Sequence, residues 1–319
     1  MTTPVWTFAL RSMFAAAIML AANLAHATVA AAEEATSLSD YASPIDPPIF
    51  DTPAAAVDAF KSALASNDFG ALATLLGLDA AKLKGAEGVM DAYAKIREGA
   101  ARKVVVRDLG DRQFIDIGDE LWTLPFPVAK GDDGKWSFDT YTGLEEIINR
   151  RVGENELQAI ETMRAYVEAQ RDYAAEDRDA DGVLEYAQKL LSSEGKTDGL
   201  YWPTDDINGV SPAGNLATDR AAVDKAKAGG GYYGYRFRIL TGQGDNVAGG
   251  AYDYVINGNM IAGFALIAWP VKYADTGVHT FMVSHQGIVY QADLGANTEK
   301  LAAGIKRFNP GDDWEVTGD

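Results

Sequence analysis

Twice along this chain, a region in which apolar residues recur at helical spacing is followed by closely spaced segments in which they alternate. The first change lies near residue 100, and the second follows a stretch rich in Gly, Asp, Asn and Ser at 192–232. Strands joined by short turns pair as antiparallel neighbours, whereas parallel strands need long crossovers between them. The order therefore predicts an α+β fold with two domains, 51–150 and 151–319, and argues against a doubly wound parallel sheet.

The expected first domain begins with helices that carry clear start signals. Thr52 is a favourable N-cap and Pro53 suits a first helical turn, while Asp68 is placed to cap the next helix. Further on, the pattern predicts a third helix near 86–100 and strands at 103–109, 113–117, 121–128 and 136–140, the last two joined by a turn at 131–134.

The expected second domain begins with a long amphipathic helix over 155–174. After an acidic loop, a second helical segment is expected at 186–191. Alternation then predicts strands at 233–240, 251–256, 262–269, 278–284 and 287–292, followed by a short helix near 297–304.

Two parts of the chain resemble known folds. The opening "TPAAAVDAFKSALASNDFGALATLL" and the hairpin "PFPVAKGDDGKWSFD" resemble nuclear transport factor 2-like proteins, which implies cone-like helices with an antiparallel sheet. The segments "AYVEAQRDY", "GYRFRIL", "GFALIAWPV" and "GVHTFMVSHQGIVY" resemble, in that order, the globular part of type IV pilin-like and pseudopilin proteins. That likeness implies a long helix with an antiparallel sheet. Pilins carry an apolar stem before this helix, whereas a whole domain precedes it here.

Over residues 48–317, roughly, the chain resembles the secreted bacterial domain-of-unknown-function family 2950. The likeness is carried by "EEIINRRVGENELQAIETMRAYVEAQRDYA", "DRDADGVLEYAQ", "DGLYWP" and "GGAYDYVINGNMIAGFALIAWP". It implies export from a bacterial cell and supplies no activity.

The N-terminus has the pattern of a secretory signal peptide over 1–32. Arg11 precedes an apolar run at 13–22, and two small-x-small sites follow, which predict a mature start near Thr28 or Glu33. The run is too short for a comfortable membrane span, although a retained anchor is the alternative. Residues 33–50 resemble a linker. We therefore expect a periplasmic or secreted protein with no stable membrane span after cleavage.

Composition narrows the classes of partner. The absence of cysteine excludes disulfides, thiol catalysis and cysteine-bound zinc. The chain has 46 acidic and 28 basic residues, and such an acidic surface repels nucleic acid and anionic lipid. Metal cations and cationic ligands fit this surface better. The partner is expected to be an unidentified envelope protein or glycan.

The segment "DRDADGVLEYAQ" has the spacing of a calcium loop. Oxygen ligands are expected at its positions 1, 3 and 5, a Gly turn at 6, a backbone carbonyl at 7, and further oxygens at 9 and 12. These expected metal ligands are Asp177, Asp179, Asp181, Val183, Glu185 and Gln188, with the turn at Gly182.

Position 12 of this loop holds Gln188 where a bidentate Glu would normally complete the shell. Calcium would therefore bind weakly, with a Kd of about 10⁻⁴–10⁻³ M, and act as a structural rather than a catalytic cofactor. The alternative is a solvated acidic connection with a Gly turn and no ion.

Other chemically suggestive residues have simpler explanations. His279 and His285 are more consistent with strand and turn residues than with a metal or catalytic pair. The run "GGGYYG" precedes a strand, so it is not a dinucleotide-binding turn. Aromatic segments at 200–203, 232–235 and 252–254 either line a ligand or glycan surface or pack long loops against the sheet.

Three hypotheses about function remain. The favoured one is an exported, non-enzymatic binding protein with a weak structural calcium site. A hydrolase of envelope or glycan material would need two facing carboxylates near the aromatic loops. An accessory of a pilus or secretion system would follow from the pilin-like second half. No catalytic residue and no cofactor other than calcium is assigned.

Overall fold

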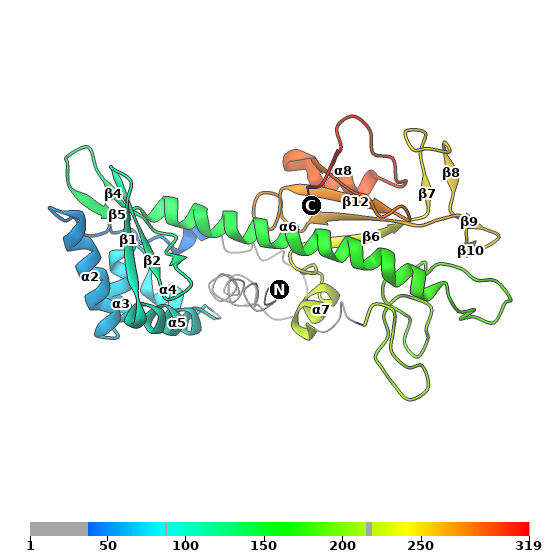
Figure 1. The fold of residues 1–319 in the computed structure, drawn as a ribbon, viewed down its shortest axis with the longest axis horizontal. Helices are drawn as coiled ribbons and strands as arrows, with labels where there is room; N and C mark the ends of the chain where they lie inside the picture. Colours follow the sequence, from blue (N-terminus) through cyan, green and yellow to red (C-terminus); the bar gives the residue numbers. More distant parts are fainter. Residues whose placement is uncertain (1–37, 87, 215–218, 319) are drawn as a thin grey trace, which may run out of the picture. The chain divides into compact units, whose positions relative to one another are not determined.

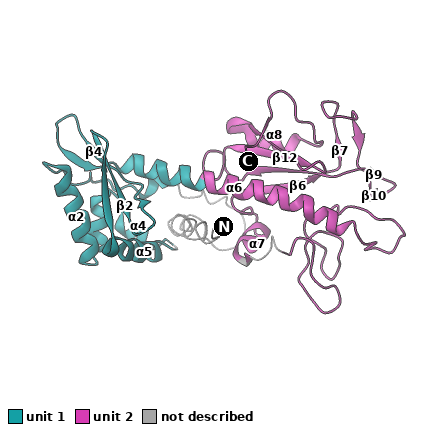
Figure 2. Ribbon diagram, in the orientation of Figure 1, with its two compact units in different colours: residues 1–151 teal, residues 152–319 magenta. Residues whose placement is uncertain are grey.

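The computed structural model describes residues 38–86, 88–214 and 219–318. The chain divides into two compact units, 1–151 and 152–319 (Figure 2). Every pairing between named strands is antiparallel. The α+β class predicted from the order of helical and alternating segments is therefore confirmed. The signal peptide and residues 33–37 of the 33–50 linker lie outside the described residues.

The first unit begins with helices, and side-chain caps fix where two of them start. The Thr52 hydroxyl accepts a hydrogen bond from the Ala55 N–H at 3.2 Å, and the Asp68 carboxylate accepts one from the Ala71 N–H at 2.9 Å. Both predicted caps are thus confirmed. The helical elements of this unit are η2 (Leu38–Tyr41), α2 (Pro53–Ala65), α3 (Phe69–Leu75), α4 (Ala80–Lys84) and α5 (Val89–Arg102). The short α4 was not predicted.

The sheet of the first unit has the order β1-β2-β4-β5, with β3 paired to β2 (Figure 1). The strand expected at 121–128 is wrong as a single element, because Pro125 and Pro127 lack the N–H that a strand ladder needs. It is divided into β3 and β4 instead. The strands are β1 (Val104–Asp108), β2 (Arg112–Ile117), β3 (Trp122–Thr123), β4 (Val128–Lys130) and β5 (Trp136–Phe138).

A buried carboxylate connects three of these strands. Asp116 on β2 is only 4% exposed, and it accepts two hydrogen bonds from Arg107 on β1, at 2.5 and 3.0 Å. The Thr123 hydroxyl on β3 donates a third at 2.6 Å. The hydrogen bonds from Arg107 stabilise the carboxylate and hold the pKa of Asp116 below its usual value.

Helix α6 (Thr140–Tyr173) begins earlier than the sequence predicts. The Asp139 carboxylate accepts hydrogen bonds from the N–H and the hydroxyl of Thr142, as an N-cap does. Gly143 leaves room for the Phe126 ring, which lies 2.0 Å from where a Cβ would stand. The helix therefore includes the polar residues and the two glycines before residue 155, where the sequence predicted that it would begin. The division between the two units falls within α6, between Arg151 and Val152.

The second unit is built on a five-stranded sheet with the order β14-β13-β12-β11-β6. Its core includes Met163 and Tyr166 of α6 and the first five residues of β11, and all six residues of β11 are buried. The main strands are β6 (Tyr235–Leu240), β11 (Ala265–Pro270), β12 (His279–Ser284), β13 (Val289–Asp293) and β14 (Glu315–Val316). The remaining elements are α7 (Arg220–Lys227), β7 (Gly242–Gln243), β8 (Tyr252–Asp253), β9 (Val255–Ile256), β10 (Asn259–Met260), η3 (Gly295–Asn297) and α8 (Thr298–Gly304).

The helical segment expected at 186–191 is wrong. Its backbone groups bond to distant partners instead of to each other: the Tyr186 N–H donates to the Met260 carbonyl, and the Leu200 N–H donates to the Lys189 carbonyl. The strand expected at 251–256 is divided into β8 and β9, which pair with different neighbours. No helix within the described ranges combines the length and the apolar character that crossing a bilayer requires.

Replacing Asp116 by Ala should destabilise the first unit by about 2 kcal/mol, because three hydrogen bonds to a buried charge are lost. Asp119→Ala, which removes an exposed carboxylate, should change stability by less than about 0.5 kcal/mol. Urea unfolding of both variants gives the comparison.

The pH dependence provides a second readout of the same contact. Since the native pKa of Asp116 is lowered, its contribution is complete above the unfolded pKa of about 3.9 and is lost as the pH falls through the lower native value. The difference between wild type and Asp116→Ala should shrink below about pH 4. A difference that is constant down to pH 2 would contradict this account.

Candidate functional site

The main candidate site is a cavity of about 430 Å³ in the second unit. Its walls come from α6, from the irregular chain around 190–201, from α7 and the turn that follows it, and from strands β6 and β11. It is lined by Thr162, Tyr166, Leu190, Leu191, Leu200, Tyr201, Ala213, Val223, Ala226, Gly229, Gly231, Tyr232, Tyr235, Arg236, Phe237, Leu266 and Trp269.

Two of the three aromatic segments singled out in the sequence meet at this cavity. Tyr201 comes from the first, and Tyr232 and Tyr235 come from the second. The third segment does not take part. Its Tyr254 is fully buried and donates to the Gln243 side chain at 3.2 Å, so it packs the core as the alternative explanation had it.

Local hydrogen bonds hold the irregular wall in place. The Asp198 carboxylate accepts from the Ser193 N–H at 2.7 Å and from the Lys189 ammonium at 2.6 Å. The Lys189 hydrogen bond is the main reason that the pKa of Asp198 falls to about 2. Beyond this turn, Leu191 and Tyr201 form a parallel bridge, which brings both side chains to the cavity.

A second anchor fixes the α7 wall. The Asp219 carboxylate caps α7 by accepting from the Ala222 N–H at 3.0 Å. Its other oxygen accepts from the Tyr233 hydroxyl at 2.9 Å, which ties the helix to the turn leading into β6. Sequence reasoning missed α7 and the lining residues Val223 and Ala226, although an Asp cap before apolar residues three apart was a usable signal.

The described part of the cavity wall is mainly apolar. Among its described lining residues there is no carboxylate and no histidine. Arg236 is already paired with Glu299, which also accepts from the Trp269 indole N–H at 2.9 Å. Burial raises the pKa of Tyr232 and Tyr235, so both phenols are neutral at ordinary pH. This arrangement suits the binding of an apolar group.

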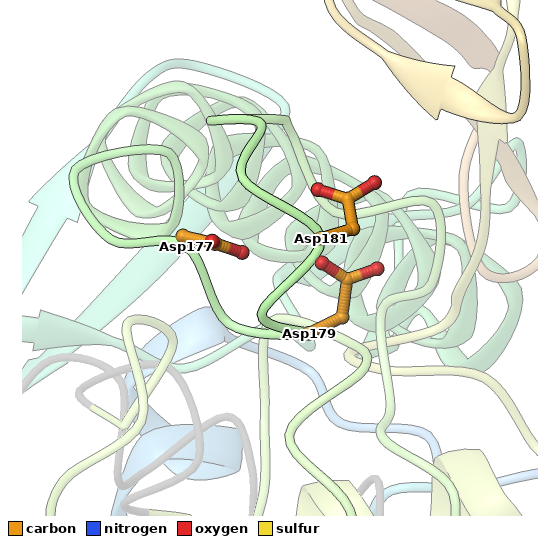
Figure 3. Close-up of side chains that lie close together, drawn as sticks. All are labelled: Asp177, Asp179 and Asp181. Carbon is orange, nitrogen blue, oxygen red and sulfur yellow. The ribbon is translucent and has the colours of Figure 1, made fainter.

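The acidic loop brings three of its predicted ligands together. Asp177, Asp179 and Asp181 each offer an oxygen, and these oxygens lie within 4.8 Å of one another. Figure 3 shows the carboxylates of Asp179 and Asp181 side by side, with that of Asp177 pointing across the loop toward them. Gly182 has a φ of 88°, and its N–H donates to Asp177 at 2.9 Å, which closes the turn.

The other expected ligands contact the β9–β10 hairpin. An oxygen of Glu185 accepts from the Met260 N–H at 3.1 Å, and the Gln188 amide donates to the Gly258 carbonyl at 2.6 Å. Val183 lies in the turn, where its N–H donates to Asp181 at 2.8 Å. Asp181 also accepts from the Asn259 amide at 2.7 Å.

The two histidines have separate environments. His279 Nδ1 lies 3.1 Å from Glu156, whose other oxygen accepts from the backbone N–H groups of Val278 and His279. His285 follows the end of β12 and contacts the rings of Tyr254 and Phe264 edge-on. Burial lowers the pKa of His285.

Comparison with known proteins assigns a family. The model of the family described as "Protein of unknown function (DUF2950)" matches residues 48–317, which include parts of both units, and it confirms the likeness seen in the sequence. No curated protein and no solved structure matches the chain. The likenesses to nuclear transport factor 2-like and pilin-like folds therefore stay expectations from the sequence.

The cavity wall depends on a buried amide, Gln170 of α6. Its amide N–H groups donate to the Ala187 carbonyl at 2.8 Å and the Tyr166 hydroxyl at 2.9 Å, and its oxygen accepts from the Ala187 N–H. Gln170→Met should cost about 3 kcal/mol, because it leaves buried backbone groups unpaired. Gln286→Met, at an exposed position, should cost less than about 0.5 kcal/mol. Equal unfolding midpoints for the two variants would contradict this role.

Proposed function

We propose a function for this chain, which belongs to the DUF2950 family of proteins of unknown function. The protein is a non-enzymatic binding protein that is exported from a bacterial cell. It holds an apolar part of an envelope partner in the cavity of its second unit. The proposal rests on one observation: Tyr201, Tyr232 and Tyr235, together with aliphatic side chains, line a cavity of about 430 Å³. Binding sites are commonly concave and mainly apolar with a few polar groups.

The chemistry of the lining favours binding over hydrolysis. A glycan hydrolase of the usual kind places two carboxylates about 5–10 Å apart across its substrate. The described lining offers none, and Glu299, which contacts two lining residues, is paired with Arg236 and hydrogen-bonded to Trp269. An apolar group held there would exclude water without meeting an acid or a base.

The acidic loop is proposed as a weak structural calcium site. Three carboxylates drawn within 4.8 Å repel one another, and a divalent cation would remove that repulsion. Asp177, Asp179 and Asp181 would supply the oxygens, with the Val183 carbonyl and the free oxygen of Glu185 within the same short segment. The ion would stiffen the chain between α6 and the β9–β10 hairpin.

Calcium should stabilise the second unit. With a Kd of about 10⁻⁴–10⁻³ M, ten millimolar calcium should add roughly 1.4 to 2.7 kcal/mol and raise the Tm, and magnesium should add less because it keeps its waters. The variant Asp179→Asn/Asp181→Asn should lose most of this response and still fold without calcium, because the mutual repulsion is relieved.

The matched control for charge is Asp312→Asn/Asp313→Asn, which removes an exposed acidic pair near the C-terminus. It should respond to calcium as the wild type does. Calorimetric melting curves with and without calcium decide the matter. A wild-type Tm that does not move at ten millimolar calcium would leave the loop an acidic turn only.

Binding in the cavity can be measured with the apolar dye 1-N-phenylnaphthylamine, which fluoresces when it leaves water. The wild type should bind the dye, and Ala226→Trp, which fills the cavity from α7, should weaken binding by at least about tenfold. Ala221→Trp places the same ring on an exposed position of the same helix and should bind as the wild type does.

Both variants should have wild-type circular dichroism, so that a loss of binding reports on the cavity. Dye binding that is absent from the wild type, or equal in wild type and Ala226→Trp, would overturn the proposed binding function.

Export is tested separately. The proposal expects the mature chain to begin near Thr28 or Glu33 in the periplasmic or secreted fraction, because both follow small-x-small sites. N-terminal sequencing of that fraction checks this. An intact Met1 on protein recovered only from the cytoplasm would contradict it.

A further inference from the structure

The cavity lies against the last strand of its sheet. Among the described strands, β6 pairs with β11 on one side and has no named strand on the other (Figure 1). All six residues of β11 are buried, whereas residues 236–239 of β6 are only half-buried. The centre of β6 is therefore partly exposed.

The direction of the backbone groups follows from the bonds at the start of β6. The Val271 N–H donates to the Gly234 carbonyl, so Gly234 faces β11. The N–H and C=O of Tyr235 both bond to Tyr232, on the opposite side. In an antiparallel ladder this direction alternates residue by residue. Phe237 and Ile239 therefore point their N–H and C=O groups outward, away from β11.

The cavity reaches this outer edge. Successive residues of a strand face opposite sides of the sheet. The cavity is nevertheless lined by both Arg236 and Phe237, with Trp269 on the side of Arg236 and Leu266 on the side of Phe237. A cavity with walls on both sides of one strand includes the edge between them, so the outward backbone groups of Phe237 lie where a ligand would be.

We propose that the ligand of this cavity is an extended peptide segment of a partner protein, which adds to the free edge of β6 as a further strand. The outward N–H and C=O groups of Phe237 and Ile239 pair with the backbone of the peptide, and its alternate apolar side chains enter the cavity beside Tyr201 and Tyr232. This inference rests on the proposed binding function and names its ligand class.

A peptide satisfies the site better than a hydrocarbon does. An apolar small molecule would fill the volume and leave the edge groups of Phe237 and Ile239 without protein partners while excluding water from them, which is costly. An extended peptide supplies donors and acceptors at the repeat of the strand and apolar groups at every second residue. One ligand then both pairs with the backbone groups at the edge of β6 and fills the apolar cavity.

The test uses a pool of peptides about seven residues long, with apolar residues randomised at alternate positions and Ser, Thr or Lys between them. Wild-type protein should enrich members of the pool over the blocked variant Ala226→Trp, and Ala221→Trp should enrich the same members. An enriched peptide is then N-methylated on one alternate set of residues or on the other. One set should weaken binding by about tenfold or more, and the other should have little effect, because only one edge of the peptide faces β6.

Amide hydrogen exchange locates the contact on the protein. At a peptide concentration about ten times its Kd, the amides of Phe237 and Ile239 should exchange roughly tenfold more slowly, while those of Arg236 and Arg238, which face β11, should change little. No enrichment over Ala226→Trp, equal effects of both N-methylated sets, or unchanged exchange at Phe237 and Ile239 would each overturn strand addition.

The dye experiment distinguishes a failure of the peptide inference from a failure of the proposed binding function. If the wild type binds 1-N-phenylnaphthylamine and Ala226→Trp does not, but no peptide is enriched, the cavity is a binding site and the peptide inference is wrong. If neither dye nor peptide binds, the proposed binding function itself is wrong.

Discussion

The three hydrogen bonds of the buried Gln170 side chain hold the second unit together at its least regular part. This amide satisfies both backbone groups of Ala187 and the hydroxyl of Tyr166. The chain from 187 to 201 has almost no secondary structure of its own, so its path depends on such long-range bonds. That path supplies one wall of the cavity, and the acidic loop lies between its start and the end of α6. Gln170 therefore fixes the chain at Ala187, between the acidic loop and the irregular wall of the cavity.

Features of the fold and of the candidate sites could be predicted from the sequence where the interactions that decide them lie within a few residues along the chain. The caps at Thr52 and Asp68 and the strands β1, β2, β6, β11, β12 and β13 were predicted, because each is decided within a few residues, whereas the short β14 was not. The segment 186–191 was predicted helical and is not, since its partners at Gln170 and Met260 are distant in the chain. Likewise Arg236 and Trp269 join the cavity through the pairing of β6 with β11, which no local pattern specifies.

In the acidic loop, too, the local contacts could be predicted from the sequence and the long-range contacts could not. Local spacing placed three aspartates near one another, and the structure brings their oxygens within 4.8 Å. The spacing did not predict that Glu185, Gln188 and Asp181 would also bond to the β9–β10 hairpin. Those bonds give the loop a structural role with or without an ion, because they join the chain after α6 to a hairpin 70 to 78 residues further on.

The continuity of α6 across the division at Arg151 has an evolutionary consequence. A chain cut in a loop gives two pieces whose hydrogen bonds are intact, whereas a cut within a helix exposes up to four N–H and four C=O groups at the new ends. Recombination at this boundary would therefore give each piece a frayed helix end. Selection against such pieces would keep the two units on one gene, in one order, as a single heritable block. The family match runs through this boundary, from residue 48 to residue 317.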